Sequence, residues 1–391
     1  MKLLTVSPYF ESHRGGVEIV AGRLARELAG RGLDVTWLAS DTDAPPADLT
    51  TAAYHAWNFA ERRLGIPYPL PGPSALRQIG RAVAASDAVL VHDALYATSV
   101  ATVLAARRRK KPVLMVQHIG QIPYRSLIAR TLMGIANATV APAMLGRADQ
   151  VVFISETTQR FFERVRLRRP AMLIHNGVDT AVFQLAQAGA TAARQATLGL
   201  DPTRPQALFV GRFVEKKGLA HLERLTALRP DIDFNFAGWG PLDPESWGRP
   251  NVRVFRDKAG ASLAALYQAC DALVLPSVGE GFPLVVQEAL ACGLAVVCGA
   301  ETVEADAAAG PLLHGVAIDD DPTVTAPRVA AALDAALADG DAAARAAFAA
   351  ARYDWGAIAE RYHALLTQLT AAAPPAVRAP AAGRADTVAA A

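Results

Sequence analysis

Residues 277–293 read Ser-Val-Gly-Glu-Gly-Phe-Pro-Leu-Val-Val-Gln-Glu-Ala-Leu-Ala-Cys-Gly. A turn with two glycines and a proline leads directly into an apolar helical pattern. Pro283 suits the first helical position, where a missing N–H group costs little. Because the start of a helix offers free backbone N–H groups and the positive end of the helix dipole, this stretch predicts an anion site.

Two acids, Glu280 and Glu288, flank that predicted helix start. Carboxylates beside an anion site repel phosphate, so we expect them to accept hydrogen bonds from hydroxyl groups instead. A ligand with phosphates in its middle and hydroxyls at both ends is a nucleotide sugar. The sequence therefore predicts a nucleotide-sugar site at this turn.

On both sides of this stretch, short apolar runs alternate with helical patterns, which predicts parallel sheets covered on both faces. Helices are expected over Gly16–Arg31, from Leu219, and over Ser262–Ala269, Leu284–Cys292, Val329–Leu337 and Trp355–Leu369. Strands are expected at Leu3–Ser7, Val35–Ala39, Ala88–His92, Val113–Gln117, Val151–Ser155, Ala207–Gly211, Asp233–Ala237, Val252–Phe255, Ala272–Pro276 and Ala295–Cys298.

The pattern restarts halfway along the chain, so the predicted fold class is α/β, with two Rossmann-like α/β/α domains facing each other across a cleft. We expect an acceptor-side domain over residues 1–178 and a nucleotide-sugar-binding domain over residues 179–354. A helix at about 355–370 is expected to join the first domain. Residues 371–391 are rich in Ala and Pro and are expected to be disordered.

The formal net charge is only +2, but it is unevenly distributed. Residues 1–178 hold 22 Lys and Arg against 13 Asp and Glu, a net charge of +9, and residues 179–391 have a net charge of −7. A basic first half suggests an anionic partner such as a membrane surface or a phosphorylated substrate. Mutual attraction between two oppositely charged domains explains the same asymmetry.

The sequence also indicates a cytoplasmic protein without a spanning segment. Cys270, Cys292 and Cys298 lack zinc-type spacing and lie in or beside apolar runs, as reduced core residues do. The first residues turn polar too soon for a signal peptide. The longest uncharged run, residues 131–146, has 16 residues, fewer than the ~20 that cross a bilayer.

Basic and glycine-rich turns follow two of the predicted strands. Arg212 can hold a diphosphate through two parallel N–H bonds, and Lys217 can add a point charge. Near the N-terminus, Gly15 and Gly16 open a helix and allow backbone N–H groups to approach a phosphate. The chain has no GxGxxG sequence, which disfavours a nicotinamide dehydrogenase.

Polar residues also follow other predicted strands. His118 and His92 each follow a strand and are candidates for hydrogen-bond donors or proton carriers facing the cleft. Asn176 begins an Asn-Gly-Val-Asp turn at the domain boundary, so it is a candidate for either a hinge or a ligand contact.

Taken together, these residues resemble the retaining glycosyltransferases of the GT-B fold, in the large family called GT4. The resemblance covers most of residues 1–370. It rests on these matching motifs: Gly15-Gly16-Val17-Glu18, the His118 loop, Ser155-Glu156, Asn176-Gly177-Val178-Asp179, Gly211-Arg212 with Lys217-Gly218, and the two glutamates of Glu280–Glu288.

The resemblance implies a role for each of these residues. Glu280 would meet hydroxyls of the donor sugar near the reacting carbon, and Glu288 would bind the ribose. Arg212 and Lys217 would neutralise the diphosphate leaving group. His118 would contact the donor sugar or the acceptor, so the implied catalytic set is Glu280, His118, Arg212 and Lys217. The implied donor contacts add the glycines of the first turn and the backbone around the second: Gly15, Gly16, Gly281, Phe282, Leu284 and Val285.

The resemblance further implies that the enzyme needs no cofactor and no metal ion. One departure concerns the loop after Val297, where the family commonly has a Gly-Gly-x-x-Glu turn. Here the chain reads Cys298-Gly299-Ala300-Glu301-Thr302-Val303-Glu304, which leaves the identity of the donor sugar open.

Two features hint at a lipid-linked saccharide acceptor and an anionic membrane surface as a partner. One is the basic run at residues 107–111, and the other is the apolar segment Tyr124–Arg147, which has Arg near both ends and no acid. A solvated helix end and a buried helix at Leu127–Leu145 explain them equally. Nucleic-acid binding has only the short basic run in its favour. The leading function is sugar transfer to a glycan or lipid-linked acceptor in cell-surface polysaccharide or glycolipid biosynthesis; a nucleotide-sugar epimerase and a non-catalytic partner subunit of the same fold are the alternatives.

Overall fold

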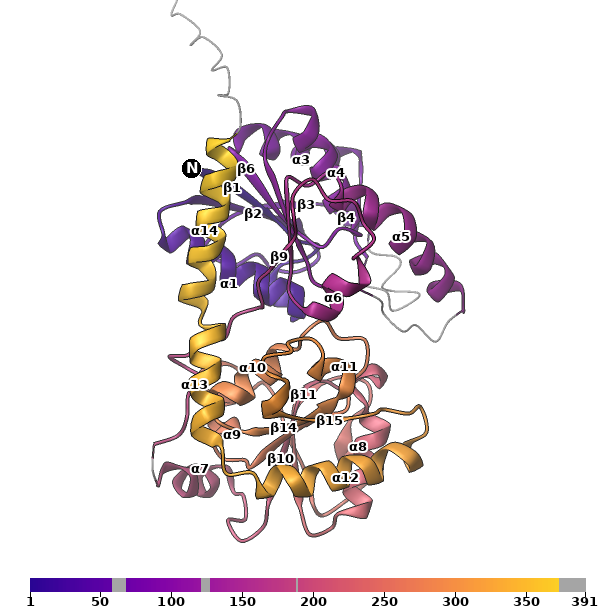
Figure 1. Ribbon diagram of the computed structural model, residues 1–391, viewed down its shortest axis with the longest axis vertical. Coiled ribbons are helices and arrows are strands. Elements are labelled where there is room, and N and C mark those ends of the chain that lie inside the picture. Colours follow the sequence, from indigo (N-terminus) through magenta and orange to yellow (C-terminus); the bar gives the residue numbers. More distant parts are fainter. Residues whose placement is uncertain (58–67, 121–126, 188, 373–391) are drawn as a thin grey trace, which may run out of the picture.

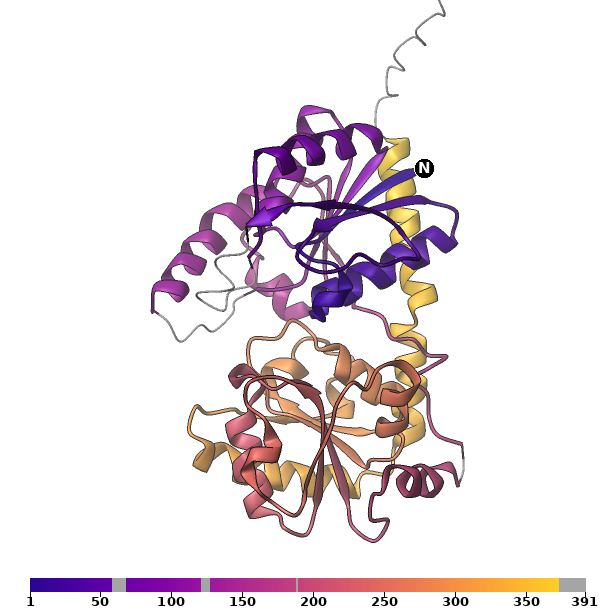
Figure 2. The same ribbon diagram turned by 180° about the vertical axis from the view of Figure 1, so that it is seen from behind.

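A computed structural model describes residues 1–57, 68–120, 127–187 and 189–372. The chain forms two α/β lobes stacked end to end, with two C-terminal helices running along one side of both (Figures 1 and 2). The predicted α/β fold class is confirmed. The predicted disordered tail begins at residue 371, which is the last residue of a helix, and residues 373–391 lie outside the described part.

The first lobe is built on a seven-stranded sheet in the order β3-β2-β1-β6-β7-β8-β9, and all its strand pairs are parallel. Its central strands are buried along most of their length because helices cover both faces, whereas the two edge strands are more exposed. The strands are β1 (Lys2–Val6), β2 (Asp34–Ser40), β3 (Thr50–Tyr54), β6 (Ala88–His92), β7 (Val113–Gln117), β8 (Gln150–Phe153) and β9 (Met172–Leu173), with a separate hairpin of β4 (Ala56–Trp57) and β5 (Leu70–Pro71). The helices are α1 (Gly16–Gly30), α3 (Pro73–Ala85), α4 (Ala97–Arg108), α5 (Leu127–Leu145) and α6 (Glu156–Phe161).

The second lobe repeats this plan with a six-stranded parallel sheet in the order β12-β11-β10-β13-β14-β15. Its strands are β10 (Gln206–Arg212), β11 (Asp233–Trp239), β12 (Val252–Phe255), β13 (Ala272–Leu275), β14 (Ala295–Gly299) and β15 (Leu313–Val316). Its helices are α7 (Ala190–Leu198), α8 (Leu219–Leu228), α9 (Gly260–Tyr267), α10 (Leu284–Ala291), α11 (Ala300–Val303), α12 (Pro322–Ala338) and α13 (Ala342–Tyr353).

The last helix, α14 (Trp355–Ala371), returns to the first lobe. Its buried side chains, among them Trp355, Ile358 and Tyr362, share a hydrophobic core with residues of α1 and β1 such as Leu24 and Leu3. The apolar face of α14 therefore completes the first lobe.

The two connections between the lobes pass side by side. The N–H group of Val178 donates to the carbonyl oxygen of Tyr353 at 2.7 Å, and a Cβ added at Gly177 would overlap the ring of Trp355. Asn176, whose role was left open between hinge and ligand contact, is buried at this crossing.

A buried carboxylate ties this crossing together. Asp306, which is 0% exposed, accepts hydrogen bonds from Arg352 Nε (2.6 Å) and from the hydroxyl of Tyr353 (2.6 Å). His175 Nε2 lies 3.3 Å from the same carboxylate, and the ring of Phe282 packs edge-on against His175. The connections and the helix start at Leu284 are therefore joined by continuous packing.

Within the described ranges, no helix is long and apolar enough to cross a bilayer. All three cysteines are buried and unpaired.

Candidate functional site

The carboxyl ends of the two sheets face each other, and the predicted site residues lie on the loops that follow the strands. In the second lobe, Arg212 ends β10, Lys217 lies in the turn before α8, and Glu280 precedes α10. In the first lobe, Gly15 and Gly16 start α1, and His118 follows β7. We call these facing residues the interlobe site.

An ion pair joins two of the predicted catalytic residues. Lys217 Nζ lies 3.0 Å from Glu280 Oε1, and Lys216 Nζ lies 3.8 Å from the same atom. Burial would raise the pKa of Glu280, but the two lysines outweigh burial and hold the pKa below its usual value. Glu280 is therefore a carboxylate at neutral pH.

Glycine at position 218 lets the turn that carries Lys217 lie close to the neighbouring strand. Gly218 has φ +78°, and a Cβ there would overlap the carbonyl oxygen of Pro276 at the end of β13. A left-handed conformation is strained for other residues. The turn therefore packs directly onto β13, which places Lys217 beside the turn that holds Glu280.

The predicted helix is present and starts at Leu284, as expected. Pro283 is the N-cap residue of α10 rather than its first helical residue, because its ψ of 131° is extended. The N–H groups of Leu284 and Val285 donate to no acceptor among the described residues, whereas that of Val286 donates to the carbonyl oxygen of Pro283 at 3.1 Å. Two N–H groups at the positive end of the helix are thus available for an anion.

Glu288 lies one helical turn into α10. The hydroxyl of Tyr267 donates to Glu288 Oε2 at 2.8 Å. Burial raises the pKa of Glu288 to about 7, although the hydrogen bond from Tyr267 opposes the change. Glu288 and Glu280 therefore have different environments: one is held ionised by lysines, and the other is half-protonated near pH 7.

Arg212 extends from the end of β10 and is exposed, and no ion pair with it is formed by any residue of the described ranges. Across from it, the Cβ position of Gly16 faces open space, so its backbone can be approached closely. An exposed guanidinium opposite an open helix start suits a ligand with several negative oxygens.

The lobes touch at glycine 281. A Cβ at this position would overlap the carbonyl oxygen of His118, and the hydroxyl of Thr157 in α6 donates to the Gly281 carbonyl at 3.4 Å. His118 and Glu280, which are far apart in sequence, are therefore near neighbours in the structure.

The two histidines are buried and paired with each other rather than exposed. His92 Nδ1 lies 3.0 Å from His118 Nε2. Burial lowers the pKa of His118 to about 3 and the pKa of His92 well below its usual value. Both rings are neutral at pH 7, which leaves hydrogen bonding as their role and argues against the predicted alternative of a proton carrier.

Two acids of the first lobe were not predicted as site residues. Glu18 in the first turn of α1 is 5% exposed, and burial raises its pKa to about 7. Asp93 follows β6 with φ +68°, is 2% exposed, and has one carboxylate oxygen without a hydrogen-bond partner among the described residues. The sequence could have indicated them by position, because Glu18 lies at a helix start and Asp93 directly follows a strand. Their burial could not be seen in the sequence.

The loop that departs from the family pattern also reaches this site. The carboxylate of Glu301 accepts a hydrogen bond from the N–H group of Gly279 at 3.2 Å, and Glu304 pairs with Arg160 of the first lobe at 3.0 Å. The unusual residues therefore support the turn that carries Glu280.

We predict that Glu18 makes stability depend on pH. Its folded pKa of about 7 exceeds its ordinary value of 4.5, so the folded state binds the proton more tightly and stability falls as pH rises between these values. Glu18→Gln should remove a cost of up to about 3 kcal/mol at pH 8 and little at pH 4.5. Thermal unfolding at pH 5 and pH 8 measures this. A difference between variant and wild type that is the same at both pH values, or that is matched by the surface control Glu163→Gln, would contradict it.

Comparisons with known proteins agree with this geometry. The family model "Glycosyltransferase Family 4" matches residues 14–182, and "Glycosyl transferases group 1" matches residues 204–339. The chain is 32% identical over 309 residues to alpha-maltose-1-phosphate synthase of Mycobacterium tuberculosis, which covers 71% of this chain and 78% of that protein.

Solved structures share the fold over nearly the whole length. Sucrose-phosphate synthase from Thermosynechococcus elongatus superposes with a TM-score of 0.72 at 21% identity, over 95% of this chain and 100% of that one. HepE from Anabaena, in complex with UDP, superposes with a TM-score of 0.71 at 18% identity, over 94% of this chain and 100% of that one. The chain belongs to glycosyltransferase family 4 and has the GT-B fold.

Proposed function

We propose that this glycosyltransferase moves a sugar, with retention of configuration, from a nucleotide-diphosphate sugar to a glycan or lipid-linked saccharide in cell-surface polysaccharide or glycolipid biosynthesis. The observation that carries the proposal is the ion pair of Lys217 and Glu280 beside the start of α10. It sets a cation, a carboxylate and free N–H groups next to one another, as a diphosphate bonded to a sugar requires.

The diphosphate lies against the positive elements of both lobes in this proposal. Arg212 and Lys217 bind its oxygens, the N–H groups of Leu284 and Val285 bind one phosphate, and the N–H group of Gly16 binds from the first lobe. The N–H group of Phe282 completes this set. UDP in the complex of HepE supports a nucleotide diphosphate as the ligand class.

The two glutamates bind hydroxyls at opposite ends of the donor. Glu280, held ionised by Lys217, accepts hydrogen bonds from the sugar near its reacting carbon. Glu288, further along α10, binds the ribose together with Tyr267. Gly281 contributes its backbone, because a side chain there would displace His118.

The chemistry follows from these charges. When the C–O bond between sugar and diphosphate breaks, positive charge develops on the sugar and negative charge on the phosphate. Preorganised cations aimed at the phosphate stabilise that transition state most strongly. The acceptor hydroxyl bonds to the same face of the sugar, and its proton passes to the departing phosphate oxygen, so retention needs no separate base.

On the acceptor side, His118, His92 and the first lobe are assigned to acceptor binding, with Asn176 as a hinge. The basic first half of the chain and the exposed side chains of α5 support an anionic or lipid-linked acceptor presented at a membrane surface, and thus a cytoplasmic, peripheral enzyme. Leu132 and Ile135 of α5 are 64% and 57% exposed.

The nucleotide and sugar are identified by a thermal-shift screen of UDP-, GDP- and ADP-sugars. A ligand at 100 times its dissociation constant stabilises the folded state by about 2.7 kcal/mol, which is readily detected. Stabilisation by none of these nucleotides would overturn the proposed donor. A product with inverted anomeric configuration, seen by NMR, would overturn retention.

We predict that Lys217→Ala and Arg212→Ala each weaken binding of the selected nucleotide diphosphate by roughly tenfold to a hundredfold, because a charge-assisted hydrogen bond is worth about 1.5–3 kcal/mol. Lys216→Ala is the matched control, since its ammonium is farther from Glu280 and more exposed. Isothermal titration measures all three. Equal losses for Lys216 and Lys217 would show that only general charge matters at this turn.

We predict that Glu280→Gln lowers turnover by about 100-fold while nucleotide affinity changes little, because the lost charge faces the sugar and not the phosphate. Initial rates and titration with the nucleoside diphosphate alone separate the two effects. A parallel fall in turnover and nucleotide affinity would place Glu280 at the diphosphate instead.

We predict that turnover persists in excess EDTA, because protein cations and a helix start already neutralise the diphosphate. The chain contains a sequence that could bind a metal ion instead: Asp41 and Asp43 form an Asp-x-Asp sequence after β2. Their carboxylates face histidines, with Asp41 Oδ2 3.1 Å from His55 Nδ1 and Asp43 Oδ2 2.9 Å from His13 Nδ1. Loss of activity in EDTA and its recovery with Mg²⁺ or Mn²⁺ would refute metal independence.

A further inference from the structure

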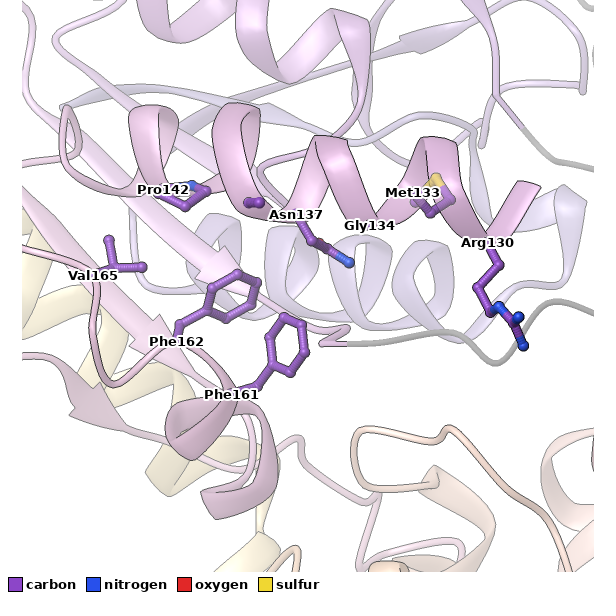
Figure 3. A pocket seen from close by; sticks show the side chains of 9 residues that line it. Arg130, Met133, Gly134, Asn137, Pro142, Phe161, Phe162 and Val165 are labelled. Atoms are coloured by element: carbon purple, nitrogen blue, oxygen red, sulfur yellow. The ribbon is translucent and has the colours of Figure 1, made fainter. Parts of the chain in front are cut away.

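A cavity of about 360 Å³ opens in the first lobe between α5 and the end of α6 (Figure 3). This volume lies within the range of ~300–1,000 Å³ typical of small-molecule sites. Figure 3 shows Arg130, Met133 and Asn137 projecting from α5 on one side and Phe161 and Phe162 on the other. None of the site residues described above lines it.

The walls of this cavity are mainly apolar. Met133 and Pro142 line it from α5, and Phe161, Phe162 and Val165 line it from the opposite side. Phe161 is 43% exposed, although full burial of such a side chain is worth about 1.5–3 kcal/mol. An apolar ligand chain would therefore gain contact area that the protein leaves uncovered.

Two polar groups accompany these apolar walls. Arg130 is exposed at the cavity, and no acid of the described ranges pairs with it. Asn137 Oδ1 is shielded from solvent and has no hydrogen-bond donor among the described residues. A free cation and an unsatisfied acceptor beside apolar walls fit an amphipathic molecule that carries an anion and a hydroxyl.

The cavity adjoins the interlobe site. Asn137 Nδ2 donates to the carbonyl oxygen of Gly120 at 3.3 Å, and the ring of Phe161 lies 3.2 Å from the Cβ position of that glycine. Two residues before Gly120, the carbonyl oxygen of His118 packs against Gly281. Helix α6 also connects the two sites, because Thr157 contacts Gly281 and Phe161 lines the cavity. The six residues of this helix measure roughly 9 Å.

The stretch of sequence that supplies both walls of the cavity is basic. Residues 130–169 contain seven arginines and three acids, although Arg160 and Arg168 form ion pairs. A net positive charge in this stretch favours an anionic group. Of the described residues that line the cavity, Arg130 is the one cation, and its guanidinium can bind one phosphate through two parallel N–H bonds.

We propose that this cavity binds the lipid part of the acceptor, an alkyl or prenyl chain that carries a phosphate, and so holds the attached saccharide at the interlobe site. The inference rests on the proposed function and assigns it an acceptor subsite. Phe161 and Met133 contact the chain, and Arg130 contacts the phosphate.

The outer face of α5 offers a different apolar surface, and the two can be separated by mutation. Leu132 and Ile135 are exposed but do not line the cavity. A bilayer lying on the helix would use these residues, whereas a single lipid chain in the cavity would use Phe161. Leu132→Ser is therefore the matched control for Phe161→Ser.

The test uses dodecyl phosphate below its micelle-forming concentration, with inorganic phosphate as the second probe, followed by isothermal titration. Wild type and Leu132→Ser should bind dodecyl phosphate equally. Phe161→Ser should weaken binding at least tenfold, as the loss of an apolar contact of this size requires. Arg130→Gln should weaken it as well, and inorganic phosphate should not compete at the same concentration.

Three results would overturn the proposal: no saturable binding to wild type, an equal loss in Leu132→Ser and Phe161→Ser, or full competition by inorganic phosphate. If Phe161→Ser does not fold, Met133→Gln gives the same comparison. The nucleotide diphosphate selected by thermal shift is titrated in parallel, and its affinity should be unchanged in Phe161→Ser. If wild type binds no nucleotide, the proposed function fails; if it binds nucleotide but not dodecyl phosphate, only the lipid subsite fails.

Discussion

Parallel strands in one sheet all end at the same edge, and the rest of this structure depends on that constraint. It collects the loops after β1, β6 and β7 on one lobe and those after β10, β13 and β14 on the other. Because the two edges face each other, residues as distant in sequence as His118 and Gly281 come into contact. Neither lobe alone contains both the cations of the second sheet and the glycine turn of the first.

The contacts between the lobes set how closely those edges approach. Gly281 fits against His118 only because it lacks a side chain, while Thr157 and Arg160 of α6 bind the backbone and side chains of the second lobe. On another side, the guanidinium of Arg14 lies 5.3 Å from the ring centre of Trp239, which is the strand partner of Arg212. The glycine turn that begins α1 is thus anchored beside the arginine that we assign to the diphosphate.

Much of the fold could be predicted because buried parallel strands are continuous apolar runs. The bounds of β6, β7 and β12 agree with the sequence to the residue. β15 was missed because only two of its four residues are buried, and α13 was missed because its many alanines give little periodic contrast. Helix α10 starts at Leu284 as predicted, but Pro283, which suits the first helical position, is its N-cap residue.

The candidate site was predictable where residue type determines chemistry, and less so where burial determines it. Arg212, Lys217, Glu280 and Glu288 belong to recognisable sequence motifs. By contrast, the raised pKa values of Glu18 and Asp93 follow from desolvation inside a folded lobe, and the neutral state of His118 does too. The apolar cavity at Phe161 lies between two helices, and the sequence pattern of neither helix reveals how they pack against each other.

The return of α14 to the first lobe has a consequence for how the protein is made. The core that contains Leu3 and Leu24 is completed by Trp355, Ile358 and Tyr362, which leave the ribosome more than 300 residues later. During synthesis the first lobe therefore exposes an apolar face until the second lobe has emerged. The described core of the second lobe, in contrast, is completed by α13, which directly follows it in the chain. Nascent chains of this topology should depend on chaperones at the lobe that is translated first, not at the one translated last.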